Sequence, residues 1–316
     1  MAKKVIFKKF LSPCMQQVTI KNEYINLTTL PYGAIIQELL VKDQYGGETN
    51  MVACFKNPED YLTDTISLGA CVGRFAGRIS GGSIFIDGSE YPIYQEDRVH
   101  LHGGKVGFAK KHWTLIEVNK GAQPYVKYGY NSPHLEEGYP GNLEVIVTYQ
   151  LIGNALIIKH EARTDAPTIV NLTNHSYFQL DNEPGIGHYK LQVAAEHTLQ
   201  TDKKLLPTGI LAPVKNTEND FKEEKAISET LLDTPFVVTP NEPDTAVVHS
   251  NKSGIRLRIT TNQPAIVIYT PEEFPAICFE TQNYPDAPTY TSFPSSILRP
   301  GESYLNESRF VFDLVP

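Results

Sequence analysis

Short segments in which apolar and polar residues alternate recur along the whole chain. Residues 143–165 show this pattern on both sides of a Gly-Asn dipeptide, and residues 81–94 show it around an Asp-Gly dipeptide. Residues 254–270 contain another pair of strand-like runs. Because a period of two places successive side chains on opposite faces of a strand, these segments predict antiparallel β-hairpins.

Helical periodicity is hard to find in this chain. The best candidate is the charged stretch 215–235, which is either a helix or a long surface loop. Glycine and proline, 22 of each, punctuate the apolar runs, and no segment has the composition of a linker. We therefore predict an all-β fold, a large antiparallel β-sandwich that forms a single domain over residues 1–316.

Composition and charge narrow the classes of function. The chain has 316 residues, of which 41% are hydrophobic and 20% are charged, as is usual for a globular protein with a sizeable core. Its formal net charge is -8, and its only basic run is the initial AKKVIFKKF, so we expect no nucleic-acid partner. A small neutral molecule fits this composition better as a ligand.

The sequence also indicates where the protein works. No apolar stretch reaches the roughly 18 residues of a membrane span, and the start lacks the apolar run of a signal peptide. We therefore expect a cytoplasmic protein, either a monomer or a homodimer, with no membrane contact. Its four cysteines are Cys14, Cys54, Cys71 and Cys278. Because none of them form a Cys-x-x-Cys pair, we expect reduced thiols rather than a disulfide framework or a structural zinc site.

Polar side chains gather on one face of residues 171–180, NLTNHSYFQL, if this segment is a strand. That face carries Asn171, Thr173, His175, Tyr177 and Gln179. Hydrogen-bonding side chains beside an aromatic ring suit a polyhydroxylated ligand. A solvent-facing strand of a sandwich would look similar, and His175 could equally be a structural histidine. The segment alone supports both interpretations about equally.

Two further histidines, His100 and His102, alternate just before a Gly-Gly pair that allows a close backbone approach to a ligand. Together with His175 they raise the question of a metal site. The sequence has no His-Glu-x-x-His motif, and no carboxylate stands at a diagnostic spacing from these histidines. We therefore expect no bound metal.

Glu280 stands inside the apolar run AICFE, where a carboxylate is costly to bury without a partner. It is either a member of a structural ion pair, which the residues alone slightly favour, or a general base. The segment GRFAGRIS supplies Arg74 and Arg78, which could bind hydroxyl groups or pair with Glu280. The chain has neither a nucleophile elbow nor a phosphate-binding loop.

Five motifs, in this order, closely resemble those of the aldose 1-epimerases, also called galactose mutarotases. They are GRFAGRI, LHGGKVGFAKKHW, NLTNHSYFQL, TTNQPAIVIYT and FETQNYPDAPTYTSFPSSILRPGESY. The resemblance runs from about residue 16 to Tyr304 and so covers almost the whole chain. It implies a galactose mutarotase-like β-supersandwich that interconverts the α and β anomers of free hexoses, such as galactose and glucose, without a cofactor.

The resemblance also implies roles for single residues. His175 would be the general acid, Glu280 the general base and His102 a second histidine at the sugar. The implied sugar-binding residues are Arg74 in the Gly-Arg motif and Asp244 in NEPDTAV. To these we add Tyr177 and Asn171 from the polar strand face, as substrate-binding candidates.

Two alternatives stay open beside this interpretation. One is an epimerase for a related sugar, such as maltose or a hexose 6-phosphate. A phosphorylated substrate calls for extra cationic residues, and the motifs here do not resemble that branch. The other is a catalytically silent carbohydrate-binding protein on the same sandwich. Such a protein would lack the acid or the base, whereas this chain has both His175 and Glu280.

Overall fold

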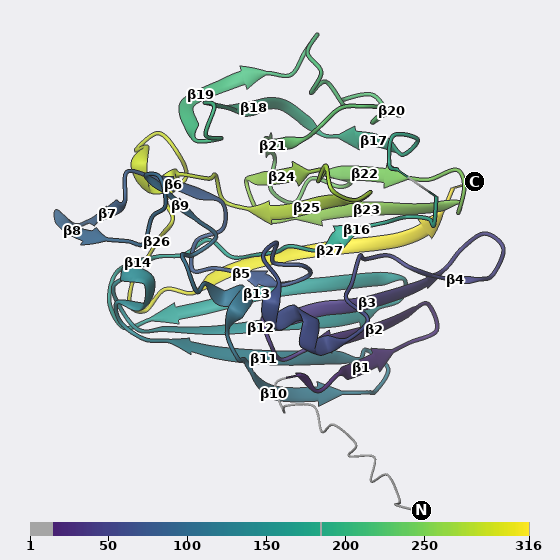
Figure 1. The fold of residues 1–316 in the computed structure, drawn as a ribbon, viewed down its shortest axis with the longest axis horizontal. Helices are drawn as coiled ribbons and strands as arrows, with labels where there is room; N and C mark the ends of the chain where they lie inside the picture. The colour runs from purple at the N-terminus through teal and green to yellow at the C-terminus, as the bar shows by residue number, and fades with distance from the viewer. Residues whose placement is uncertain (1–14, 184, 316) are drawn as a thin grey trace, which may run out of the picture.

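The computed structural model describes residues 15–183 and 185–315 and is built almost entirely of strands (Figure 1). The N-terminal strands are β1 (Val18–Lys21), β2 (Ile25–Leu30), β3 (Ile35–Lys42), β4 (Glu48–Asn50), β5 (Cys71–Val72), β6 (Arg78–Ser80), β7 (Ser83–Ile86), β8 (Ser89–Pro92) and β9 (Val99–Leu101). The central strands are β10 (Thr114–Asn119), β11 (Tyr125–Ser132), β12 (Leu143–Ile152), β13 (Ala155–Thr164), β14 (Thr168–Ile169), β15 (Thr173–Asn174), β16 (Tyr177–Phe178), β17 (Lys190–Val193), β18 (Ala195–Thr201) and β19 (Pro207–Pro213). The C-terminal strands are β20 (Lys225–Ala226), β21 (Asp233–Val238), β22 (Ala246–His249), β23 (Ile255–Thr261), β24 (Ala265–Tyr269), β25 (Ile277–Gln282), β26 (Ile297–Leu298) and β27 (Tyr304–Leu314). Short 3₁₀ helices join them: η2 (Pro58–Thr63), η3 (Phe108–Lys110), η4 (Glu136–Gly138) and η5 (Ala287–Thr289).

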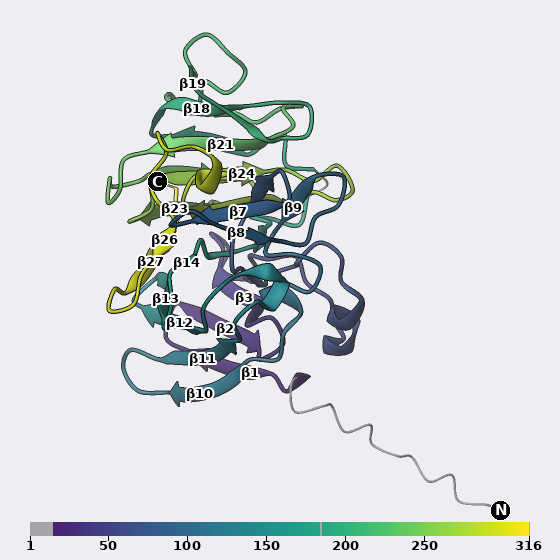
Figure 2. The same cartoon turned by 90° about the vertical axis from the view of Figure 1, so that its left-hand side faces the viewer.

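Two large antiparallel sheets dominate the fold, which confirms the predicted all-β class. One sheet has nine strands in the order β10-β11-β12-β13-β27-β23-β22-β17-β20, and the other has six in the order β16-β25-β24-β21-β18-β19. A four-stranded sheet, β1 to β4, lies beside β11 and β12 in both views (Figures 1 and 2). Strands β6 to β9 project at one end of the six-stranded sheet.

The hairpin predictions hold in two of three cases. Strands β12 and β13 pair through Ile152 and Ala155, so the Gly-Asn dipeptide is the whole turn. Strands β7 and β8 turn at Asp87 and Gly88, whose φ angles of 51° and 80° are those of a type I′ turn. Residues 254–270 do form two strands, but β23 belongs to the nine-stranded sheet and β24 to the six-stranded sheet. This segment therefore connects the two sheets instead of forming a hairpin.

The charged stretch 215–235 contains no helix in the structure. It is mostly loop, with β20 pairing against β17 and with Asp233 opening β21. Of the two predicted alternatives, the surface loop is the correct one. The charged residues alternate with too few apolar ones to give a helix an apolar stripe that it could bury.

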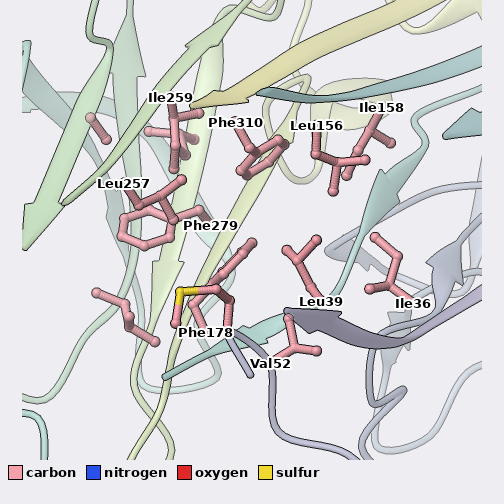
Figure 3. Close-up of a cluster of buried hydrophobic side chains, with 14 of the residues drawn as sticks. Ile36, Leu39, Val52, Leu156, Ile158, Phe178, Leu257, Ile259, Phe279 and Phe310 are labelled. Atoms are coloured by element: carbon pink, nitrogen blue, oxygen red, sulfur yellow. The ribbon is translucent and has the colours of Figure 1, made fainter. Parts of the chain in front are cut away.

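The largest of three clusters of buried apolar side chains among the described residues joins the sheets. Figure 3 shows Phe178, Phe279 and Phe310 meeting in this core, with aliphatic side chains of β3, β13 and β23 around them. The rings of Phe178 and Phe310 stack with their centroids 5.7 Å apart. Because this cluster draws on all three sheets, it supports the single-domain assignment, which stays a prediction.

Two remaining sequence expectations concern the thiols and the membrane. Cys54, Cys71 and Cys278 are free thiols, whereas Cys14 and the basic N-terminal run lie outside the described residues. Among the residues described, no helix has both the length and the apolar character needed to cross a bilayer.

A buried histidine makes the stability of the fold depend on pH. His160 lies on the core face of β13 between Ile158 and Ala162 and is 2% exposed. Neither of its ring nitrogens has a hydrogen-bond partner among the described residues. Burial lowers the pKa of His160 from 6.5 to about 3, so acidification protonates this ring in the unfolded chain before the folded one.

We expect His160→Leu to remove this acid sensitivity. Between pH 7 and 5 the wild-type protein should lose about 2 kcal/mol more unfolding free energy than the variant, because only the unfolded wild type gains the proton. Urea unfolding at the two pH values measures this difference. Equal losses in both proteins would show that His160 is protonated in the folded state.

Candidate active site

One pocket collects most of the residues singled out from the sequence. Strands β16, β18, β21, β24 and β25 of the six-stranded sheet supply one wall. The other lining residues come from β6, β9 and the loops that connect the strands. The described residues that line it are Thr65, Ile66, Ser67, Gly77, Arg78, Leu101, His102, His175, Tyr177, Thr201, Leu205, Asp233, Pro235, Val267, Tyr269, Glu280, Gln282 and Pro285.

Alternation along β25 places its polar residues at the pocket. Ile277 and Phe279 pack into the main core, whereas Glu280 and Gln282 line the pocket. The side chain of Cys278, on the same strand face as these two, contacts His175. Packing of the apolar face of β25 in the core therefore fixes the position of the Glu280 carboxylate on the opposite face.

The segment 171–180 follows the predicted alternation, although it is divided into short bridges instead of one strand. Leu172, Phe178 and Leu180 enter the main core, and His175 and Tyr177 line the pocket. The pairing of Tyr177 with Cys278, continued by two residues, places His175 opposite Glu280 on the adjacent strand.

Asn171 shares the predicted polar face but does not line the pocket. Its amide donates to the carbonyls of Ala76 and Asn283, at 3.1 and 3.3 Å, and accepts a bond from the Asn283 N–H at 2.8 Å. These bonds tie three segments of backbone together below the site. The structure therefore places Asn171 outside the pocket, where its amide joins backbone segments.

His175 and Glu280 form a buried pair. The Nε2 atom of His175 lies 3.4 Å from Oε1 of Glu280, and each residue is 4% exposed. The Nδ1 atom of His175 faces the Cys278 thiol at 3.7 Å, and its ring stacks on Tyr177 at 4.9 Å. Contacts on both sides thus fix the orientation of the imidazole.

Burial shifts both members of this pair in the direction of the neutral form. It lowers the pKa of His175 to about 4 and raises the pKa of Glu280 to about 8, an increase to which the nearby Asp233 carboxylate adds. Between these two values the pair holds one proton, which resides on Glu280 while His175 is neutral. A single shared proton is what an acid and a base that exchange roles require.

His102 enters the pocket from the end of β9. The backbone N–H of Gly77 donates to its Nδ1 at 3.2 Å, and the His102 N–H donates back to the Gly77 carbonyl at 3.0 Å. Burial lowers the pKa of His102 well below 6.5. A neutral ring that accepts at Nδ1 carries its proton on Nε2, so His102 offers the pocket a hydrogen-bond donor.

His102, His175 and Glu280 place possible metal-ligand atoms within 4.8 Å of one another. Two histidines and a carboxylate are a common ligand set for divalent metals. A ligating histidine, however, donates its other ring N–H to an acceptor, whereas Gly77 donates into the ring of His102. Because this hydrogen bond puts the proton on Nε2, where the lone pair is needed, the donor set does not fit a metal.

The arginine at the pocket is Arg78, and Arg74 lies elsewhere. Arg78 lines the pocket, and its Nη2 atom lies 3.6 Å from Oδ2 of Asp233. Arg74 is 2% exposed, and its guanidinium donates to the hydroxyl and carbonyl of Ser132 and to the carbonyls of residues 133, 140 and 141. Arg74 therefore has no donor left for a ligand, and Arg78 is the arginine that lines the pocket.

The acidic residue at the pocket also differs from the one predicted. Asp244 lies in the turn before β22 and pairs with Arg258 at 3.3 Å, outside the pocket. Asp233, at the start of β21, lines the pocket. Sequence reasoning missed Asp233 because it ends a charged loop in which five other acidic residues offer the same local pattern.

Comparison with known proteins gives consistent matches over nearly the whole length. The family model described as aldose 1-epimerase matches residues 16–311. The galactose mutarotase of Rattus norvegicus is 36% identical over 95% of this chain and 94% of its own. The crystal structure of an aldose epimerase homologue from C. elegans is 29% identical, with a TM-score of 0.90 over 95% of this chain and 99% of its own. That of a galactose 1-epimerase from Lactobacillus acidophilus NCFM is 28% identical, with a TM-score of 0.85 over 95% of both chains.

Substitutions of Arg74 and Arg78 should have clearly different effects on the unfolding free energy. Arg74→Met leaves several buried carbonyls without a donor, so we expect it to lower the unfolding free energy by more than about 3 kcal/mol. Arg78→Met removes a partly exposed ion pair and should cost less than about 1 kcal/mol. Urea unfolding of both variants tests this assignment, and equal losses would contradict it.

Proposed function

Because the chain belongs to the aldose 1-epimerase family, we propose that it acts on free hexoses, interconverting the α and β anomers of galactose, glucose or a related aldose. It is an isomerase, and its fold is the galactose mutarotase-like supersandwich. The observation that carries the proposed chemistry is the buried His175–Glu280 pair, which combines an acid and a base at 3.4 Å.

The reaction needs two proton transfers, one at each of the two oxygens that are bonded to C1. Glu280 accepts the proton of the C1 hydroxyl while His175 donates a proton to the ring oxygen, and the bond between C1 and the ring oxygen breaks. The product is the open-chain aldehyde, in which rotation about C1–C2 exposes the other carbonyl face. Ring closure then returns both protons with the two roles reversed, so that protons and electrons balance.

The spacing of the pair suits these two transfers. The C1 hydroxyl and the ring oxygen are bonded to the same carbon, so the groups that serve them have to stand close together. A separation of 3.4 Å between His175 Nε2 and Glu280 Oε1 meets this requirement. In the reactive tautomer this proton has moved from Glu280 to His175, which leaves Glu280 as the carboxylate, and the raised pKa of Glu280 makes it an effective base.

Other pocket residues would hold the sugar. His102 donates from Nε2, and the partly exposed pair Arg78 and Asp233 offers donors and acceptors to neighbouring hydroxyls. The hydroxyl of Tyr177 already donates to the Ile66 carbonyl at 3.0 Å and its ring stacks on His175, so this residue contributes to the pocket wall beside the acid. Because these residues would bind the other parts of the sugar, His175 and Glu280 stay available for the two oxygens on C1.

The electrostatics of the pocket favour an uncharged sugar over a hexose 6-phosphate. Arg78 is the only lysine or arginine among the described residues that line it, and Asp233 already faces that guanidinium. A phosphate dianion would gain little there and would meet the carboxylates of Asp233 and Glu280. The silent-binding alternative is disfavoured because both members of the proton-transfer pair are present.

We also propose that the enzyme works in the cytoplasm on sugar in solution. The free thiols of Cys54, Cys71 and Cys278 are typical of a reducing compartment. We propose that it does so as a monomer or a homodimer.

Substitution of the pair should abolish most of the catalysis. We expect His175→Ala and Glu280→Gln each to lower kcat by about 10²- to 10⁴-fold, because each removes one positioned proton transfer. Polarimetry of freshly dissolved α-galactose measures the rate above the spontaneous one. His188→Ala and Glu307→Gln, which lie outside the pocket, are matched controls that should keep wild-type activity.

Two results would count against this assignment. A wild-type rate equal to the spontaneous rate would disprove the enzymatic function itself. Full activity in Glu280→Gln, with an active wild type, would show that another group is the base.

The pH dependence follows from the one-proton requirement. As the pH falls through about 4 the pair binds a second proton and loses its base, and as it rises through about 8 the pair loses its last proton and its acid. We therefore expect kcat/KM for galactose to form a plateau between these values. A single transition near pH 6.5 would instead indicate a histidine that titrates independently of Glu280.

A further inference from the structure

Gln282 carries a carboxamide for which residues 15–183 and 185–315 provide no hydrogen-bond partner. Neither its nitrogen nor its oxygen has a hydrogen bond among the described residues, although the residue is 0% exposed. Gln282 ends β25 and lines the pocket. A buried amide without partners destabilises the folded state, so its presence calls for an explanation outside the protein's own contacts.

Neighbouring buried amides show that this is not a general feature of the region. Asn171 and Asn283 bond to each other's segments, and Asn283 also donates to the carbonyls of Pro294 and Ser295. Asn306 donates to the carbonyls of Leu172 and Thr281. These three residues do not line the pocket, whereas the unpaired Gln282 does.

The position of Gln282 relative to Glu280 suggests what it meets. The two residues are separated by one position on the same strand face, a distance of roughly 7 Å along the strand. With Glu280 at the C1 hydroxyl, a sugar ring that extends along β25 would bring a hydroxyl on another carbon to Gln282.

Gly77 keeps the space beside this amide clear. Its φ of 78° is in the left-handed region, and a Cβ at this position would stand 3.2 Å from Nε2 of Gln282. Gly77 also holds His102 through two backbone hydrogen bonds. The amide of Gln282 thus borders the pocket next to a sugar-facing histidine, with no side chain at residue 77 to satisfy it.

We propose that Gln282 binds a hydroxyl group of the sugar ring other than the one on C1, and that it is a specificity-determining residue of this pocket. This inference rests on the proposed mutarotase function. Nε2 donates to the hydroxyl oxygen and Oε1 accepts its proton, so that one hydroxyl satisfies both orphan atoms. A sugar that lacks this hydroxyl leaves the amide unpaired.

The first test is Gln282→Met, which keeps the length of the side chain and removes its polar atoms. We expect kcat/KM for galactose to fall roughly 3- to 30-fold, because a hydrogen bond to the substrate is lost. The Tm should stay unchanged or rise, because the buried unpaired amide is gone. Gln263→Met is the matched control: its amide donates to Asn262 and Leu305 outside the pocket, so Tm should fall and kcat/KM should not.

The second test measures kcat/KM of wild type and Gln282→Met on 2-, 3-, 4- and 6-deoxygalactose. For one of the four sugars, wild type and Gln282→Met should have the same kcat/KM, because the hydroxyl that Gln282 binds is missing. The proposal is overturned if Gln282→Met matches wild type on galactose, or if its loss is the same on galactose and all four deoxy sugars. Wild type that does not exceed the spontaneous rate on galactose would instead refute the proposed function.

Discussion

Desolvation of the His175–Glu280 pair is the physical constraint on which the site depends. In water at neutral pH a glutamate is ionised and a histidine is mostly neutral, so neither side chain carries an acidic proton most of the time. Burial in the pocket wall penalises both charged forms, and the pKa of the carboxyl rises past that of the imidazole. The pair then keeps one proton at neutral pH, which is the state that can open a sugar ring.

The fold secures this state through strand alternation. His175 and Glu280 come from adjacent antiparallel segments whose register places them opposite each other. Phe178, three residues after His175, and Phe279, directly before Glu280, point to the other face of their strands. Both lie in the core that joins the sheets. Burial of these rings stabilises the fold by several kcal/mol and fixes the pair in the pocket wall, at a cost in desolvation that the core offsets.

Alternation and turn chemistry predicted much of this architecture from the sequence. The all-β class, two hairpins, and the shared polar strand face of His175 and Tyr177 follow from local patterns, and the motif order identified Glu280. Arg74 could not be told from Arg78 in this way, because its partners lie about 60 residues further along the chain. The position of Asp233 at the pocket and the hydrogen bond between Gly77 and His102 could not be predicted either, because both depend on contacts between segments that are distant in the sequence.

A titration of His175 by ¹⁵N NMR tests the shared proton most directly. The ring signals of selectively labelled protein, assigned with His175→Ala, should change in two steps, near pH 4 and near pH 8, and Glu280→Gln should abolish the upper step. A single step near pH 6.5 that Glu280→Gln leaves unchanged would contradict the account.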